Sequence, residues 1–94
     1  MAALVTLAQA RYRLRLTEDD DYHEPDVQMK MEQATALVID YIKRPDHGWT
    51  DADAPPVIQA TILEVLMRLF EGAEDPLSQG IKNMLQRYRD PALA

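Results

Sequence analysis

Apolar side chains recur with a helical period over residues 55–71, where the sequence reads PPVIQATILEVLMRLFE. The two prolines suit a first helical turn, because the N–H groups there have no intrahelical partners. On a helical wheel the polar side chains gather on one narrow stripe: Thr61, Glu64, Arg68 and Glu71. The apolar side chains fill an arc of roughly 200°, wider than the ~100° stripe of a surface helix: Ile58, Ile62, Leu63, Val65, Leu66, Met67, Leu69 and Phe70. We expect a long apolar central helix that forms the core and leaves part of its arc for another protein.

Two helices are predicted before it. Thr6 and Gln9 have the spacing of a capping box, in which each side chain reaches the backbone N–H of the other residue, so a first helix should cover about residues 6–14. Pro25 suits the start of a second helix over about residues 25–43. Its apolar residues form one face: Val27, Met31, Ala34, Val38, Tyr41 and Ile42. Three apolar residues fall outside that face: Met29, Ala36 and Ile39.

Residues 44–54 read as a polar loop, and Gly72 reads as the residue that ends the central helix. A last helix is expected over Pro76–Tyr88. It should bury apolar residues at helical spacing: Leu77, Ile81, Met84, Leu85 and Tyr88. We find no strong strand pattern and no repeat. Residues 1–94 are therefore expected to form one all-α domain, a small bundle of about four helices around the apolar central helix.

The composition narrows the classes of function. The chain has no cysteine, which excludes a disulfide framework and a Cys-based metal site. No apolar run is long enough to span a bilayer, so we expect a soluble protein that does not bind membranes. The formal net charge of −6 argues against a free-standing nucleic-acid binder, because such proteins must neutralise phosphates. Positive charge gathers in two short clusters: Arg11, Arg13 and Arg15, and Lys82, Arg87 and Arg89.

No constellation typical of an enzyme is present. Residues 18–26 carry six acids and no base, but they lack the glycine and the ligand spacing of a calcium-binding loop. A solvated segment at the entry of a helix is the favoured interpretation. His23 and His47 lie in polar loops without a nucleophile pattern, and we expect both on the surface. We predict no catalytic residue, no metal site and no cofactor.

Two features leave alternatives open. Trp49 stands alone in a polar loop, so it either folds back onto the core or anchors a partner protein, since tryptophan is favoured at binding hot spots. The first arginine cluster either pairs with acids of a neighbouring subunit or is simply solvated, because exposed ion pairs contribute little free energy.

Several segments resemble the tailed-bacteriophage head–tail connector proteins of the gp6-like type. The opening carries Leu4-Val-Thr-Leu-Ala-Gln-Ala10 and then Leu14-Arg-Leu-Thr-Glu-Asp-Asp-Asp21. The second predicted helix ends in Tyr41-Ile-Lys-Arg44, and the chain closes with Met84-Leu-Gln-Arg-Tyr-Arg-Asp-Pro91. Residues 55–71 are similar to the apolar third helix of that family. Adaptors of gene transfer agents, which are phage-like particles, are similar in architecture.

The resemblance implies a structural role in a virion. Such proteins form a ring, commonly of twelve subunits, below the portal of a filled capsid, and they extend the DNA channel toward a stopper or tail protein. We therefore expect a homo-oligomer at the head–tail junction, assembled in the bacterial host cytoplasm. DNA would pass without specific binding, because an acidic channel wall offers few cations to phosphates.

Two contact surfaces follow as hypotheses. The subunit interface would pair Arg11, Arg13 and Arg15 with the acids Asp19, Asp20 and Asp21 of a neighbour. Portal binding would use the C-terminal segment, with Arg87, Tyr88, Arg89 and Leu93. The rival interpretation is a small acidic helical regulatory module that binds one partner protein as a dimer.

Overall fold

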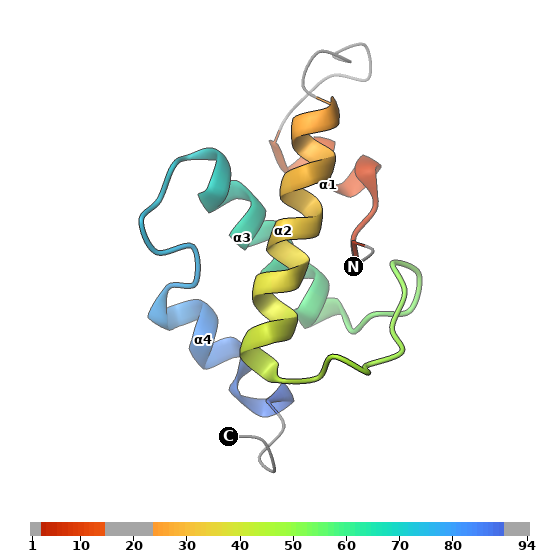
Figure 1. The fold of residues 1–94 in the computed structure, drawn as a ribbon, viewed down its shortest axis with the longest axis vertical. Coiled ribbons are helices and arrows are strands. Elements are labelled where there is room, and N and C mark those ends of the chain that lie inside the picture. The colour runs from red at the N-terminus through yellow and green to blue at the C-terminus, as the bar shows by residue number, and fades with distance from the viewer. Residues whose placement is uncertain (1–2, 15–23, 90–94) are drawn as a thin grey trace.

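The computed structural model describes residues 3–14 and 24–89, and these residues are helical apart from their connecting segments. No β-strand occurs within those two ranges, which confirms the all-α class and the small helical bundle. None of the helices there is long and apolar enough to cross a membrane. Figure 1 shows the elements in chain order: α1 (Leu7–Leu14), α2 (Glu24–Ile42), α3 (Pro56–Phe70), α4 (Gln79–Leu85) and a short 3₁₀ helix, η2 (Gln86–Tyr88).

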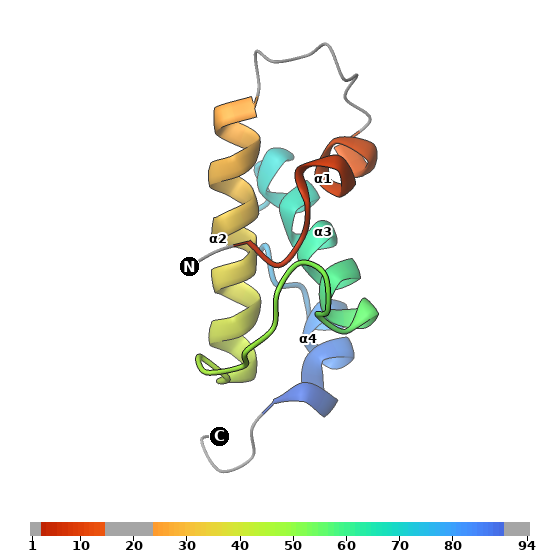
Figure 2. The same ribbon diagram turned by 90° about the vertical axis from the view of Figure 1, so that its right-hand side faces the viewer.

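The helices are arranged in two layers. α2 stands alone in one layer, and α1, α3 and α4 lie together on its other side (Figure 2). α3 packs against all three other α-helices. The fully buried side chains of α2 and α3 share one apolar cluster: Val27, Ala34, Val38 and Ile42 on α2, and Ile58, Ile62, Val65 and Leu66 on α3. Burial of each large apolar side chain contributes about 1.5–3 kcal/mol, so this contact is the main source of stability.

Thr6 and Gln9 form the capping box that the sequence predicts. The Gln9 N–H donates to Thr6 Oγ1 over 3.1 Å, and the Thr6 N–H donates to Gln9 Oε1 over 2.8 Å. Two N–H groups at the start of α1 are thereby satisfied, because the helix itself offers them no acceptor. The predicted start of the first helix is confirmed to within one residue.

Gly72 follows the C-cap of α3, as its sequence position predicts. Its φ of +72° lies in the left-handed region. The Gly72 N–H donates to the Leu69 carbonyl over 3.2 Å, and the Ala73 N–H donates to the Arg68 carbonyl over 3.0 Å. This pair of bonds is a Schellman motif, which satisfies the last carbonyls of the helix and turns the chain toward α4.

The fourth helix begins three residues later than predicted. Its expected start was Pro76, but α4 begins at Gln79 with Ser78 as its N-cap. The Ser78 hydroxyl accepts a hydrogen bond from the Ile81 N–H over 3.3 Å. Proline is compatible with a first turn but supplies no such acceptor, and the serine therefore fixes the start.

α2 is buried over a wider arc than its sequence predicts. Ile39 was expected outside the apolar face, but it is fully buried, as is Thr35 one turn earlier. The Leu4 N–H donates to Thr35 Oγ1 over 3.2 Å, so the segment before α1 lies against this side of the helix. Leu4 and Val5 join the core. The predicted buried face of α2 was too narrow because the segment before α1, which packs against this side of the helix, is too short to show a helical period.

Side-chain hydrogen bonds attach the connection between α2 and α3. Gln59, in the first turn of α3, donates through Nε2 to the Leu4 carbonyl over 3.2 Å and to the Asp51 carbonyl over 2.7 Å. One glutamine thus joins the N-terminal segment and the loop to α3.

Asp53 closes a tight turn in the same loop. Its Oδ1 accepts the Thr50 N–H over 2.6 Å and the Thr50 hydroxyl over 3.0 Å. These bonds favour the ionised carboxylate, and the backbone N–H has the larger effect. They hold the pKa of Asp53 below its ordinary value of 3.8.

Candidate protein-binding surface

An open groove crosses the layer that lies opposite α2. Its floor is the side of α3 that carries Ala60, Leu63 and Glu64, which on a helical wheel lie opposite the buried Ile62 and Val65. α1 and α4 form its walls. The larger of its two hollows has a volume of about 560 Å³, and its lining from the walls includes Arg13, Gly80 and Met84.

The second hollow lies toward α1 and has a volume of about 470 Å³. It shares Arg13 and Leu63 with the first, so the two form one continuous surface, which we call the α3 groove. Two large apolar side chains are exposed along it: Tyr12 is 87% exposed and Met84 is 49% exposed. The prediction that Met84 is buried was wrong, because α4 is short and packs only its Ile81 and Leu85 side into the core.

Arg13 forms an ion pair with Glu64 across the groove, between α1 and α3. Both side chains are partly exposed, at 42% and 45%. An exposed pair of this kind is worth about 0–1 kcal/mol, so it positions the two groups more than it stabilises the fold. Arg13 is therefore held at the junction of the two hollows, where a docked partner would meet it.

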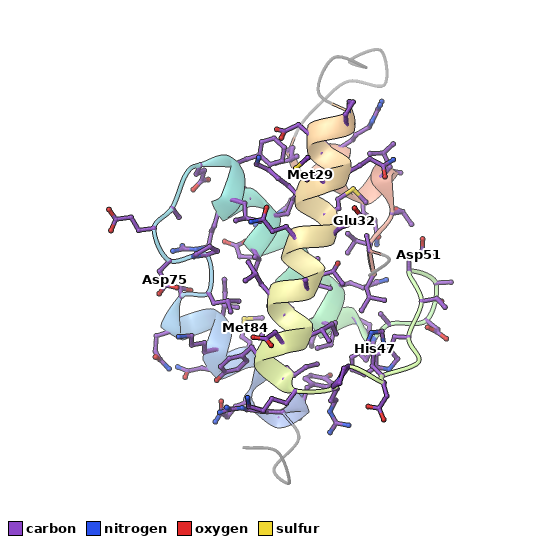
Figure 3. The ribbon with its side chains drawn as sticks, viewed as in Figure 1. Met29, Glu32, His47, Asp51, Asp75 and Met84 are labelled. Carbon is purple, nitrogen blue, oxygen red and sulfur yellow. The ribbon has the colours of Figure 1, made fainter. Side chains whose placement is uncertain are left out.

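A second face, which no other described residue covers, runs along the outer side of α2. Five exposed residues with helical spacing define what we call the α2 ridge: Met29, Glu32, Gln33, Ala36 and Asp40. Met29 is 65% exposed, and Figure 3 shows it projecting from α2 near Glu32. Met29 and Ala36 fulfil the expectation that they fall outside the buried face.

The two faces differ in charge. α1 contains two arginines and no acid, and the segment formed by α4 and η2 contains Lys82 and Arg87 and no acid. α2 contains four acids and a single base, Lys30, which pairs with Asp26 over 3.0 Å. The residues that line the α3 groove include one cation, Arg13, which pairs with Glu64, whereas the α2 ridge carries Glu32 and Asp40 and no base.

The structure places only some of the predicted subunit-interface residues. Arg13 lies in the α3 groove, and Arg11 lies half-buried on α1. The other four lie outside the described residues: Arg15, Asp19, Asp20 and Asp21. The proposed pairing between the arginines and those acids therefore stays a prediction.

Some of the C-terminal residues proposed for portal binding already make contacts within the subunit. Arg44 donates through Nε to the Tyr88 carbonyl, and Tyr88 packs against the core. The Arg89 guanidinium lies 5.1 Å from the centre of the Tyr41 ring, a cation–π contact. Arg87 is exposed, whereas Leu93 lies outside the described residues.

Trp49 is half-buried and packs against the core. The backbone N–H of Trp49 donates to His47 Nδ1 over 2.8 Å, and the two rings stack with their centres 5.3 Å apart. His47, labelled in Figure 3, thereby fixes the loop conformation that turns Trp49 inward. A partner at this position would contact only the exposed part of the indole.

Within residues 3–14 and 24–89, no group of three or more His, Asp or Glu side chains is placed to hold a metal ion. Most of the acidic run at residues 18–26, including His23, lies outside those ranges. What the described surface offers instead is apolar contact area with charged walls, which suits binding of a protein.

Comparison of the chain with family models, with curated proteins and with solved structures found no match. Sequence reasoning missed Tyr12 and Met84 as surface residues. The sequence could have indicated that Tyr12 is exposed, because it lies between two arginines on a short helix whose buried residue is Ala10.

Proposed function

We propose that this protein is a head–tail connector subunit of a tailed phage or a gene transfer agent. In this role it forms a ring of about twelve copies below the portal and recruits a stopper or tail protein. The observation that carries the proposal is a pair of faces on opposite layers that the described residues leave uncovered, because a ring requires each subunit to bind a neighbour on both sides. The sequence resemblance to gp6-like connectors supports the same conclusion.

In this proposal α3 is the apolar central helix of the subunit. Its inner residues build the core with α2, while Leu63 lines the α3 groove and Met67 is half-buried. One helix then serves both folding and assembly. That division accounts for an apolar arc wider than a single buried face needs.

The net charge of −6 fits a subunit that lines a DNA channel without gripping DNA. Affinity for DNA comes mainly from cations that displace counterions from phosphates. Asp19, Asp20 and Asp21 lie outside the described residues, and charge reversal there tests whether they line the channel instead of meeting a neighbour's arginines. Unchanged DNA passage and infectivity would exclude the channel role.

The experiment is the mass of the purified protein in solution, alone and mixed with a purified portal ring. We expect about twelve copies to join each portal ring. A stable dimer that ignores the portal would overturn the proposal and favour a small regulatory module. Deletion of residues 89–94 tests the portal contact, and unchanged portal binding would exclude the C-terminal segment.

A further inference from the structure

We propose that the α2 ridge of one copy docks into the α3 groove of a second copy. This head-to-tail contact rests on the proposed ring-forming function and names the surfaces that build the ring. It places Ala36 of one copy near Met84 and Leu63 of the next. Both faces exist in every subunit, so the contact propagates from copy to copy.

The exposed apolar side chains are concentrated on these two faces. Among the described residues, the exposed large apolar side chains are Tyr12, Met29 and Met84, and all three belong to these two faces. Figure 2 shows α2 on one side of the molecule and the helices of the groove on the other. Two faces on opposite sides of a subunit cannot contact each other within one chain. A two-fold dimer that pairs one patch with the same patch of its partner would leave the other face uncovered.

The α2 ridge and the α3 groove also have complementary shapes. A helix fits into a groove through side chains at intervals of three or four residues. The α2 ridge has that spacing, and its middle residue, Ala36, is small enough to let the helix approach the groove floor closely. On the other side, Ala60 and Gly80 leave room between the α1 and α4 walls.

Charged side chains on the two faces favour the same contact. Glu32 and Asp40 are exposed on the ridge, and eight residues of helix separate them by ~12 Å. The charged side chains that line the groove are Arg13 and Glu64, which pair with each other, and Arg13 keeps 42% of its side chain exposed for a second carboxylate. Complementary charge of this kind sets orientation and speeds association, and it weakens with added salt.

The test uses the absence of cysteine from the natural chain, so that every thiol is one that is introduced. Chains with Ala36→Cys and differently tagged chains with Met84→Cys are mixed in equal amounts and treated with a short bismaleimide. We expect the mixed 36–84 product to exceed both homodimer products together. Ala52→Cys, which is exposed in the loop and belongs to neither face, replaces Ala36→Cys as the control and should give no excess of mixed product.

Charge reversal provides the second measurement. Glu32→Lys with Asp40→Lys should reduce the mixed product several-fold. Glu71→Lys with Glu74→Lys makes the same change in net charge at exposed positions beyond α3 and should leave the yield unchanged. Circular dichroism of each double variant confirms that the fold is retained.

The outcomes separate this inference from the proposed function. A dominant 36–36 or 84–84 product, or random yields, overturns the head-to-tail contact even if portal rings recruit the protein. A dominant 36–84 product with no recruitment to a portal supports the contact and overturns the connector function.

Discussion

Two alanine substitutions at glycine should change stability in opposite directions. Gly72 has a φ of +72°, and a Cβ there would meet no atom within 4 Å. The cost of Gly72→Ala is therefore the left-handed backbone alone, roughly 1–2 kcal/mol, partly offset by the ~0.4–1 kcal/mol that alanine gains through the unfolded chain. We expect Gly72→Ala to destabilise the protein by about 1 kcal/mol.

Gly80 is the matched position. It is the second residue of α4, and a Cβ there would meet only Ser78 Oγ at 3.9 Å, an ordinary contact. Alanine is favoured over glycine within a helix by about 0.5–1 kcal/mol. Gly80→Ala should therefore stabilise the protein, although the chemical change is the same as at Gly72.

The assay is urea unfolding followed by circular dichroism at 222 nm. The two variants should differ by about 2 kcal/mol in free energy of unfolding, which corresponds to roughly 8–16 °C in Tm for a domain of this size. Their m-values should match that of the unsubstituted protein, which shows that the denatured state is unchanged. Equal effects of the same sign would refute the assignment of the Schellman motif at Gly72.

Three further predictions concern packing and the loop. Ile62→Ala should destabilise the protein by about 2–5 kcal/mol in the same urea assay, because the removed atoms lie in the α2–α3 core. Gln59→Ala should cost about 1–2 kcal/mol through two lost hydrogen bonds, whereas Gln28→Ala, exposed on α2, should stay within about 0.5 kcal/mol. The lowered pKa of Asp53 means that its contribution to stability is complete above pH 3.8, the ordinary pKa, and is lost as the pH falls through the lowered value. Fluorescence of the single tryptophan should report this acid transition, and Asp53→Asn should remove it.

Local signals explain what the sequence predicted well. The capping box at Thr6 and the glycine at position 72 act through their own backbone, so their effect is visible within a few residues. The same reasoning misplaced the start of α4, because Pro76 and Ser78 are both valid signals for a helix start. The side-chain acceptor at Ser78 decided between them.

Contacts between distant residues explain what the sequence could not predict. Ile39 is buried because residues 4 and 5 lie against α2, and nothing in the apolar pattern connects these positions. The pairing of Arg13 with Glu64 joins residues 51 apart, although each alone reads as a solvated charge. The α3 groove is therefore a property of packing, and only its apolar floor was visible in the sequence.

The way the walls of the groove are attached determines how it responds to an occupant. The main contacts of α1 are with α2 and α3, whereas those of α4 are with α3 and η2. Each wall is thus fastened to the floor by its own set of side chains. Ile81 and Leu85 of α4 belong to the same buried cluster as the α2–α3 contact, so the α4 wall cannot shift without disturbing the core. The groove is therefore formed before anything binds, and a segment that docks into it loses little free energy to reordering of the walls.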